Sequence, residues 1–258
     1  MRFAVTMARK GGLDLSQQAQ RWAGQLGVDY LPRREQGSLQ QVLEEQGLEA
    51  LLVATTQGPQ LVSAEGTFFY HPSMAVLRLQ RLKEGQGDNY VRALDLRPGL
   101  RVLDCTLGLA SDAAIASYVV GPTGRVVGVE ASTPLHFTVS RGLQHYVAED
   151  EDLTAALRRI TTVNATAADY LARCEADSFD VVYFDPMFRY PVNSSSCMEP
   201  LRPVAYVRAL DPATVEEALR VAPRVVIKER GYRIFEEYGC QEVQGGRYSK
   251  VKYGIRNR

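Results

Sequence analysis

Polar and acidic residues stand at the ends of short apolar segments from residue 100 onward in this 258-residue chain. Asp104 ends one segment and precedes a bend at Gly108, and Glu130 ends the next, 22 residues after Gly108. Asn164 ends a third segment, and Asp185 ends a fourth. In open α/β sheets, ligands bind outside the carboxyl ends of the strands, where the strand order reverses. We therefore expect these side chains to line one ligand site.

The residues beside Gly108 indicate which ligand the site suits. Glycine allows a ligand to approach the backbone closely, and the helix expected after it presents free amide groups. The bend lacks the GxGxxG pattern of dinucleotide-binding proteins and carries Asp104 and Asp112 on its two sides. These carboxylates would repel a pyrophosphate but attract the ammonium group of S-adenosylmethionine. Glu130 can accept hydrogen bonds from ribose hydroxyls.

A second group of residues follows the apolar segment 181–184. This segment is apolar without alternation, which predicts a strand buried on both faces. Asp185, Pro186 and Phe188 come directly after it. A strand of this kind would deliver all three residues to the same edge of the sheet as the acidic residues.

The pattern from residue 100 onward alternates apolar strands with helices, which predicts a doubly wound, mostly parallel sheet. The last segment, 248–255, alternates polar and apolar residues, which favours an antiparallel strand at the edge of that sheet. The other expected strands are 101–106, 124–132, 159–165, 180–185 and 224–229. The expected helices are 109–120, 134–147, 167–174 and 211–222.

Residues 1–67 also alternate strand and helix signals, and we interpret them as a small α/β subdomain before a domain of residues 68–258. Ser16 is a candidate N-cap for the first helix. Ser38 and Gln41 form a capping-box pattern that predicts the start of a second helix.

Composition limits the class of protein. Lys plus Arg and Asp plus Glu are equal at 30 each, so no global basic field indicates nucleic acid, although the segment 220–258 carries ten basic and four acidic residues. The four cysteines are far apart without a CxxC pair, which predicts reduced thiols and neither a disulfide framework nor a metal site. No segment resembles a signal peptide or a membrane span. We expect a soluble cytoplasmic protein with no membrane partner.

The segments LDCTLGLASD, VVGVEAS and VVYFDPMF resemble class I S-adenosylmethionine-dependent methyltransferases. More closely, they resemble the RsmJ family, which methylates the exocyclic amine of a guanine in small-subunit ribosomal RNA. The resemblance covers about residues 68–258, including FFYHPSMA and the closing RYSKVKYG. The N-terminal α/β piece is more similar to an uncharacterised Gram-positive-type branch of that family. The resemblance implies a seven-stranded Rossmann-like sheet and S-adenosylmethionine as cofactor.

The resemblance also assigns residues to the cofactor. The family's DxTxGxxxD pattern matches this chain from Asp104 to Asp112, but the family's usual second glycine and the arginine before the last aspartate are Ala110 and Ser111 here. Asn164 and Thr166 would lie beside the adenine ring. The expected cofactor contacts are Asp104, Thr106, Gly108, Ser111, Asp112, Glu130, Ala131, Asn164, Thr166 and Asp185.

The segment DPMF resembles the [DN]-P-P-[FYW] tetrad of methyltransferases that act on planar nitrogens. An amine conjugated to a ring is a poor nucleophile, because its lone pair is delocalised. If the Asp185 carboxylate and the Pro186 carbonyl accepted its N–H bonds, the pair would localise and point at the sulfonium methyl group. Phe188 would stack on the base. Such an in-line displacement depends on positioning and needs no covalent intermediate and no metal.

Arg189 and Lys228 are candidates for binding phosphates of an RNA substrate, most simply small-subunit ribosomal RNA or a ribosomal subunit. Surface salt bridging is an equally economical interpretation of Lys228, and Phe188 could instead cover the core. Two other functions stay open, because a fold does not determine the acceptor. One is methylation of a small molecule or a protein side chain. The other is a cofactor-binding RNA assembly factor without turnover.

Overall fold

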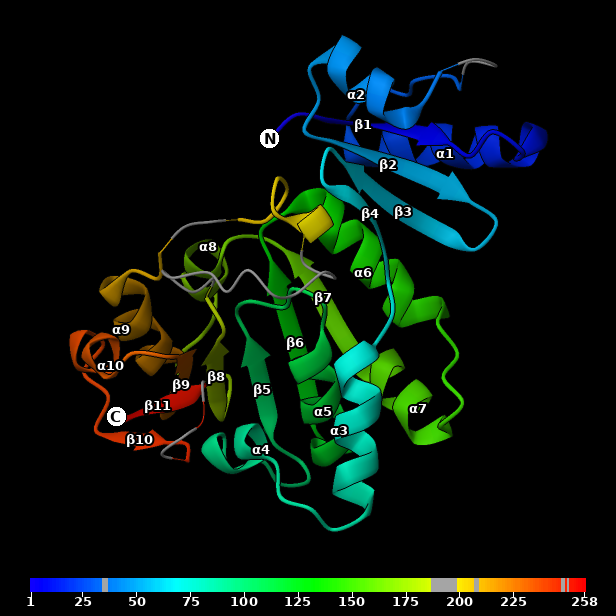
Figure 1. Ribbon diagram of the computed structural model, residues 1–258. Coiled ribbons are helices and arrows are strands. Elements are labelled where there is room, and N and C mark those ends of the chain that lie inside the picture. Colours follow the sequence, from blue (N-terminus) through cyan, green and yellow to red (C-terminus); the bar gives the residue numbers. More distant parts are fainter. Residues whose placement is uncertain (34–36, 187–198, 207–208, 247–248, 250) are drawn as a thin grey trace. The chain divides into compact units, whose positions relative to one another are not determined.

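The computed structural model describes residues 1–33, 37–186, 199–206, 209–246, 249 and 251–258 (Figure 1). The chain forms two compact units, each built from segments that are distant in sequence. The smaller unit comprises Met1–His71, Ser132–His145 and Val192–Tyr206, and the larger comprises Pro72–Ala131, Tyr146–Pro191 and Val207–Arg258. The division into folding domains at residues 67 and 68 stays a prediction. None of the described helices is both long and apolar enough to cross a membrane.

In the larger unit, seven of the described strands form one sheet in the order β10-β11-β9-β8-β5-β6-β7. Their bounds are β5 (Arg101–Asp104), β6 (Arg125–Glu130), β7 (Ile160–Asn164), β8 (Val181–Phe184), β9 (Arg224–Glu229), β10 (Glu242–Gln244) and β11 (Lys252–Asn257). The strands from β9 to β7 pair in parallel, which confirms the predicted doubly wound sheet. The predicted antiparallel strand is β11, but β10 lies outside it and forms the edge.

The strand order reverses between β5 and β8. From β5 the chain continues to β6 and β7 on one side of the sheet and then returns to β8 on the other side. The two strands lie side by side in Figure 1, with Asp104 opposite Tyr183 in the register. The amide of Cys105 extends the pairing by donating a hydrogen bond to the carbonyl of Tyr183 at 2.9 Å. The ends of β5 and β8 therefore meet at the switch point, where ligands of such sheets bind.

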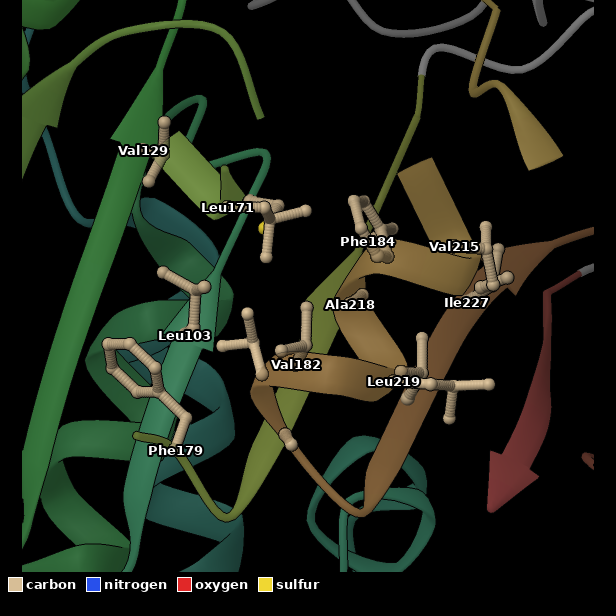
Figure 2. Close-up of a cluster of buried hydrophobic side chains, with 14 of the residues drawn as sticks. Leu103, Val129, Leu171, Phe179, Val182, Phe184, Val215, Ala218, Leu219 and Ile227 are labelled. Atoms are coloured by element: carbon tan, nitrogen blue, oxygen red, sulfur yellow. The ribbon is translucent and has the colours of Figure 1, made fainter. Parts of the chain in front are cut away.

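Helices cover both faces of this sheet. Figure 2 shows the cluster of apolar side chains on one face, where residues of β5, β8 and β9 meet helices α8 (Ala167–Leu171) and α9 (Pro212–Val221). On β8, Val182 and Phe184 point into this cluster, whereas Tyr183 points to the opposite face and reaches Asp112. Because all four residues of β8 are buried, the predicted two-sided burial is confirmed.

The opposite face carries the helices that bring charged side chains to the site. Helix α5 (Ser111–Val120) lies against the strands, and α3 (Ser73–Lys83), α4 (Asn89–Ala93) and α7 (Glu151–Arg159) pack on α5. The side chain of Asp88 caps α4 by accepting hydrogen bonds from the amides of Tyr90 and Val91 at 2.9 and 3.2 Å. The short helix α10 (Tyr232–Glu237) follows β9. Neither α4 nor α10 was expected from the sequence.

The smaller unit contains a four-stranded sheet in the order β1-β2-β3-β4. Its strands are β1 (Phe3–Met7), β2 (Ala50–Thr55), β3 (Gly58–Ser63) and β4 (Gly66–Phe69), with β1 parallel to β2 and the others antiparallel. Helix α1 (Gly12–Leu26) packs on one face and α2 (Leu39–Gln46) on the other. Helix α6 (Thr133–His145) also belongs to this unit, and its Phe137 ring packs edge-on against Trp22, with ring centres 5.1 Å apart.

Two predicted helix starts had different outcomes. The Ser38 capping box is confirmed, because the Ser38 hydroxyl accepts from the Gln41 amide at 3.1 Å and the Gln41 side chain accepts from the Ser38 amide at 2.7 Å. The Ser16 N-cap is wrong. Helix α1 begins at Gly12 after Gly11, without a side-chain cap, because the buried Leu15 already belongs to its packed face.

Candidate active site

The carboxyl end of β5 is joined to the residue after β8 by one side chain. The hydroxyl oxygen of Thr106 accepts a hydrogen bond from the backbone amide of Asp185 at 2.6 Å. The Asp104 carboxylate in turn accepts from the Thr106 amide at 3.0 Å and from its hydroxyl at 3.4 Å. The switch point is therefore fixed by hydrogen bonds that run from Asp185 through Thr106 to Asp104.

Asp104 is almost completely buried, with 1% of its surface exposed. Burial raises the pKa of this carboxyl to about 8, and the charges of Asp112 and Asp185 add to the increase, although the hydrogen bond from the Thr106 amide opposes it. A positively charged ligand group beside Asp104 would offset this cost. The site therefore favours a cationic ligand.

The turn after β5 leaves room for a ligand close to the backbone. Gly108 has φ of +48°, and its amide donates a hydrogen bond to Glu130 Oε2 at 3.1 Å, which ties the turn to the end of β6. Among the described residues, a Cβ built on Gly108 would meet just one atom within 4 Å, the Thr106 carbonyl oxygen at 3.8 Å. Ala110 also adopts a left-handed conformation, with φ of +60°, directly before Ser111 starts α5.

The residues expected near the adenine ring also have structural contacts of their own. The side-chain amide of Asn164 donates to the carbonyls of Glu130 at 2.8 Å and Ala131 at 3.4 Å, which holds the backbone after β6. Thr166 caps α8, since its hydroxyl accepts from the Asp169 amide at 3.1 Å and donates to the Asp169 carboxylate at 2.7 Å. Their contacts with a base stay predictions.

This donor set fits S-adenosylmethionine. The buried carboxyls of Asp104 and Glu130 stand at the ends of adjacent strands, on either side of the Gly108 turn. When ionised, carboxyls of this kind complement an ammonium and a sulfonium, and a carboxylate after the second strand can accept from ribose hydroxyls. Among the described residues, no cluster of His, Cys, Asp and Glu is arranged to hold a metal ion.

The structure joins Lys228, which the sequence suggested as a substrate contact, to two carboxylates that the sequence suggested as cofactor contacts. The ammonium of Lys228, on β9, lies 2.7 Å from Asp185 Oδ2 and 3.2 Å from Asp112 Oδ2. Asp112 also accepts hydrogen bonds from the Tyr183 hydroxyl at 2.8 Å and from the Arg78 guanidinium. In this structure the Lys228 ammonium is therefore bound by two carboxylates.

These contacts shift the proton affinities of the three groups in different directions. Burial raises the pKa of Asp185 to about 6, with Lys228 opposing the increase and Asp112 adding to it. For Asp112, burial also favours the neutral acid, but Lys228 and Arg78 outweigh it and lower the pKa below its usual value. For Lys228, burial favours the neutral amine, yet the two carboxylates raise the pKa above its usual range. Lys228 and Asp112 are therefore charged at neutral pH, and Asp185 is mostly ionised.

Sequence reasoning missed the residues that support this group. Arg78, on α3, donates from Nε to Asp88 at 2.8 Å, and its guanidinium lies 5.2 Å from the centre of the Tyr90 ring. The Tyr90 ring packs edge-on against Tyr183, with centres 4.8 Å apart. A single arginine within the apolar stretch of the helix beginning at residue 73 was the available signal for Arg78.

Some predicted site residues cannot be compared with the structure. Phe188 and Arg189 lie outside the described residues, whereas Pro186 is described and half-buried. Of the four cysteines, Cys105, Cys174 and Cys240 are free thiols and Cys197 lies outside the described residues.

Comparisons with known proteins identify the family. A family model described as "Putative SAM-dependent methyltransferase" matches residues 17–229. "Uncharacterized protein YpiP" of Bacillus subtilis (strain 168) is 35% identical over 239 residues, which cover 92% of each chain. Ribosomal RNA small subunit methyltransferase J of Pseudomonas paraeruginosa (strain DSM 24068 / PA7) is 30% identical over 223 residues, which cover 83% of this chain and 80% of that protein.

A solved structure supports the same fold. The crystal structure of the SAM-dependent methyltransferase NGO1261 from Neisseria gonorrhoeae matches with a TM-score of 0.63, covering 98% of this chain and 95% of that one. At 15% identity, this likeness shows a shared Rossmann-like fold. Since the family model spans most of the sequence, this chain belongs to the SAM-dependent methyltransferases, and its cofactor is S-adenosylmethionine.

Proposed function

We propose that this methyltransferase acts on the exocyclic amine of a guanine in ribosomal RNA, most simply in the small subunit. The proposal rests above all on the position of Asp185, which follows β8 at the switch point and is tied through Thr106 to Asp104. The names of the relatives at 30% identity, ribosomal RNA small subunit methyltransferase J, support an RNA substrate.

The cofactor supplies an electrophilic methyl group when it is bound. We propose that Asp104 attracts its ammonium group, that Glu130 accepts hydrogen bonds from its ribose, and that the Gly108 turn allows the backbone to approach it closely. The other expected cofactor contacts stand after the same strand ends or at the start of the helices that follow, and they stay part of this proposal: Thr106, Ser111, Asp112, Ala131, Asn164, Thr166 and Asp185.

On the substrate side, Asp185 is the proposed hydrogen-bond acceptor for the amine. With a pKa of about 6, this carboxyl is mostly ionised at neutral pH and can accept an N–H bond. The carbonyl of Pro186 would accept the second N–H, and Phe188 would stack on the base. On taking up the methyl group the amine would have to give up one N–H proton, which would pass through the Asp185 carboxylate, its proposed hydrogen-bond acceptor, to solvent. The proposed catalysis consists of positioning and of a fixed negative charge beside the developing ammonium.

The RNA would have to offer an accessible base. A paired guanine must be extruded, or the target must already be single-stranded. We propose Arg189 as a phosphate contact, and we place the protein in the cytoplasm with ribosomal RNA or a ribosomal subunit as its partner. For Lys228, contact with an RNA phosphate would compete with its two carboxylate contacts.

The test combines cells and purified protein. Mass mapping of ribosomal RNA from cells with and without the gene would locate a missing methyl group, and purified protein should restore it from labelled cofactor on undermodified subunits. Asp185→Ala should abolish this transfer, whereas Glu175→Ala, an exposed acid of the same unit, should not. Label in metabolites or protein alone would favour methylation of a small molecule or a protein side chain. Cofactor binding without transfer would favour an RNA assembly factor without turnover.

A further inference from the structure

A continuous network of ion pairs, made of five charged side chains, runs through the larger unit toward the active site. Asp88 pairs with Arg78 at 2.8 Å, Arg78 pairs with Asp112, and Asp112 is 3.2 Å from Lys228, which is 2.7 Å from Asp185. The two acids farther from the site, Asp88 and Asp112, have side chains 14% exposed, whereas the Asp185 side chain is 29% exposed. The ion-pair network therefore extends from the interior and ends on the carboxylate proposed to meet the substrate.

The inner part of this ion-pair network is held in place from several directions. Asp88 is fixed by its role as the cap of α4, so it holds Arg78 against α5. Asp112 receives hydrogen bonds from Arg78, from the Tyr183 hydroxyl and from Lys228. Side chains that are held by several partners in a poorly solvated place have little freedom to change rotamer. The ammonium of Lys228 is thus held at a defined point beside Asp185.

The Asp185 carboxylate is constrained on two sides. Its backbone amide is bound to Thr106, and its Oδ2 is bound to Lys228. Within the part of the chain that the structure describes, the hydrogen bonds of this carboxylate involve Oδ2. Oδ1 is then the oxygen that can accept an N–H bond from an amine at the switch point. Removing Lys228 would leave the carboxylate free to rotate and without its nearest cation.

We propose that Lys228 is a positioning residue that, supported by Asp112 and Arg78, both orients the Asp185 carboxylate and keeps it ionised for its role as hydrogen-bond acceptor. This inference rests on the proposed function of Asp185. It assigns the Lys228 ammonium to the catalytic carboxylate rather than to an RNA phosphate. The two assignments differ in the kinetic constant they affect, because orientation of a reacting group changes kcat, whereas substrate anchoring changes KM.

The charge of Asp185 depends on a balance between one cation and several acids. Among the described residues, the titratable groups that act on it or on which it acts include Lys228 and Glu229 on β9, Asp112 on α5, Asp104 on β5 and Tyr183 on β8. Burial and the neighbouring carboxylates favour the protonated acid, and Lys228 favours the carboxylate. A protonated Asp185 would donate rather than accept a hydrogen bond and could not localise the amine lone pair.

The balance predicts opposite effects for two substitutions. Lys228→Met keeps most of the side-chain length but removes the cation, so the acid limb of the kcat profile should move up by about one pH unit or more. Asp112→Asn removes a repelling carboxylate and leaves Lys228 with Asp185 alone, so the acid limb should move down. A purely structural loss would lower kcat at every pH without moving the limb.

The decisive experiment measures the pH profile of kcat at saturating cofactor for Lys228→Met, Lys228→Arg and a control, Lys252→Met. Lys252 is a buried lysine on β11, but its ammonium binds the Gly246 carbonyl and lies over the Tyr232 ring. We expect Lys228→Met to lose about 10- to 100-fold in kcat with KM for RNA and cofactor affinity within about twofold. Lys228→Arg should restore most of the profile, and Lys252→Met should match wild type.

A second measurement separates this inference from the proposed function. The Asp185 carboxyl can be titrated directly by carbon NMR in wild type and Lys228→Met, with Asp185→Asn to assign the signal. An upward shift in Lys228→Met supports the inference even if RNA proves not to be the substrate. Unchanged titration and an unmoved acid limb would overturn it, as would a rise in RNA KM with unchanged kcat.

Discussion

The Thr106 hydroxyl oxygen lies 2.6 Å from the backbone nitrogen of Asp185, so a side chain following β5 fixes the first residue after β8. The pairing of these strands ends with the bond from the Cys105 amide to the Tyr183 carbonyl. Beyond that point, the Thr106 hydroxyl takes the place of a further main-chain acceptor. The direction of the proposed catalytic segment therefore depends on one hydroxyl.

We expect Thr106→Val to lower kcat about 10- to 100-fold, because the Asp185 amide would lose its acceptor and the carboxylate would shift. An unsatisfied buried amide should also lower the free energy of unfolding by about 1–3 kcal/mol. Thr106→Ser keeps the hydroxyl and serves as the control in assays of turnover and thermal unfolding. If valine supports wild-type turnover, the hydrogen bond has no role in catalysis.

Asp185 and Glu130 should separate chemistry from cofactor binding. Asp185→Ala is expected to lower kcat by at least about 100-fold with a much smaller loss of cofactor affinity, because the main proposed role of Asp185 is toward the amine and its proposed cofactor contact is one of several. Glu130→Ala should weaken cofactor binding by about 10- to 100-fold, because it removes both the ribose acceptor and the partner of the Gly108 amide. Calorimetric titration with the cofactor and single-turnover rates measure the two effects. Equal losses of affinity in both variants would contradict the division of roles.

Cofactor binding should release a proton from Asp104. In the free protein this carboxyl has a pKa of about 8, so it is mostly protonated at pH 7, and a neighbouring ammonium would lower that pKa. Release should approach one proton near pH 7 and fall toward zero above about pH 9, and affinity should increase with pH over the same range. Calorimetric titration with the cofactor in buffers of different ionisation enthalpy measures the number of protons released per cofactor bound. Asp104→Asn should show a smaller release, and an identical release would exclude Asp104 as its source.

The same carboxyl should make the cofactor-free protein less stable at alkaline pH. Because its pKa is raised on folding, its contribution to stability is complete below the unfolded value near 4 and is lost as pH rises through about 8. Asparagine at this position does not titrate. The free energy of unfolding of Asp104→Asn should therefore gain roughly 2–5 kcal/mol relative to wild type between pH 4 and pH 9. Denaturant unfolding at several pH values checks this, and parallel pH curves would contradict it.

Ala110 should tolerate glycine better than a helical alanine does. Its φ of +60° costs an L-residue roughly 1–2 kcal/mol, which glycine avoids, while glycine adds unfolded-state entropy and loses a buried methyl. We expect Ala110→Gly to change the free energy of unfolding by less than about 1 kcal/mol. Ala114→Gly, buried within α5, should cost about 2 kcal/mol. A larger loss for Ala110→Gly than for Ala114→Gly in denaturant unfolding would contradict this reading of the turn.

The sheet could be predicted because its strands are short apolar segments with polar residues at their ends. Asp104, Glu130 and Asp185 could be assigned to one edge because parallel strands end together. The Lys228 contacts could not be predicted, because they depend on how far α5 is rotated against the sheet, and periodicity does not define that rotation. Tyr90, on the five-residue helix α4, was missed because so short an element has no usable periodicity.

The smaller unit shows a similar limit. The helical pattern of residues 134–147 predicts α6 but not the unit to which it belongs, because its apolar face would suit either sheet. The packing of α6 on β3, together with that of Phe137 against Trp22, assigns it to the smaller unit. Ser16 was chosen as a cap because serine prefers that position, yet burial of Leu15 extends α1 past it.

The place of β11 between β9 and β10 has a consequence for synthesis of the protein on the ribosome. Both neighbours of β11 are translated before it, so β9 exposes an unpaired edge until residues 252–257 emerge and insert. Lys228 lies on that edge, opposite Tyr253. An open strand edge is prone to pair with other chains, so the nascent protein passes through an interval in which chaperone protection matters most. The geometry around Lys228 is completed only when this late insertion has taken place.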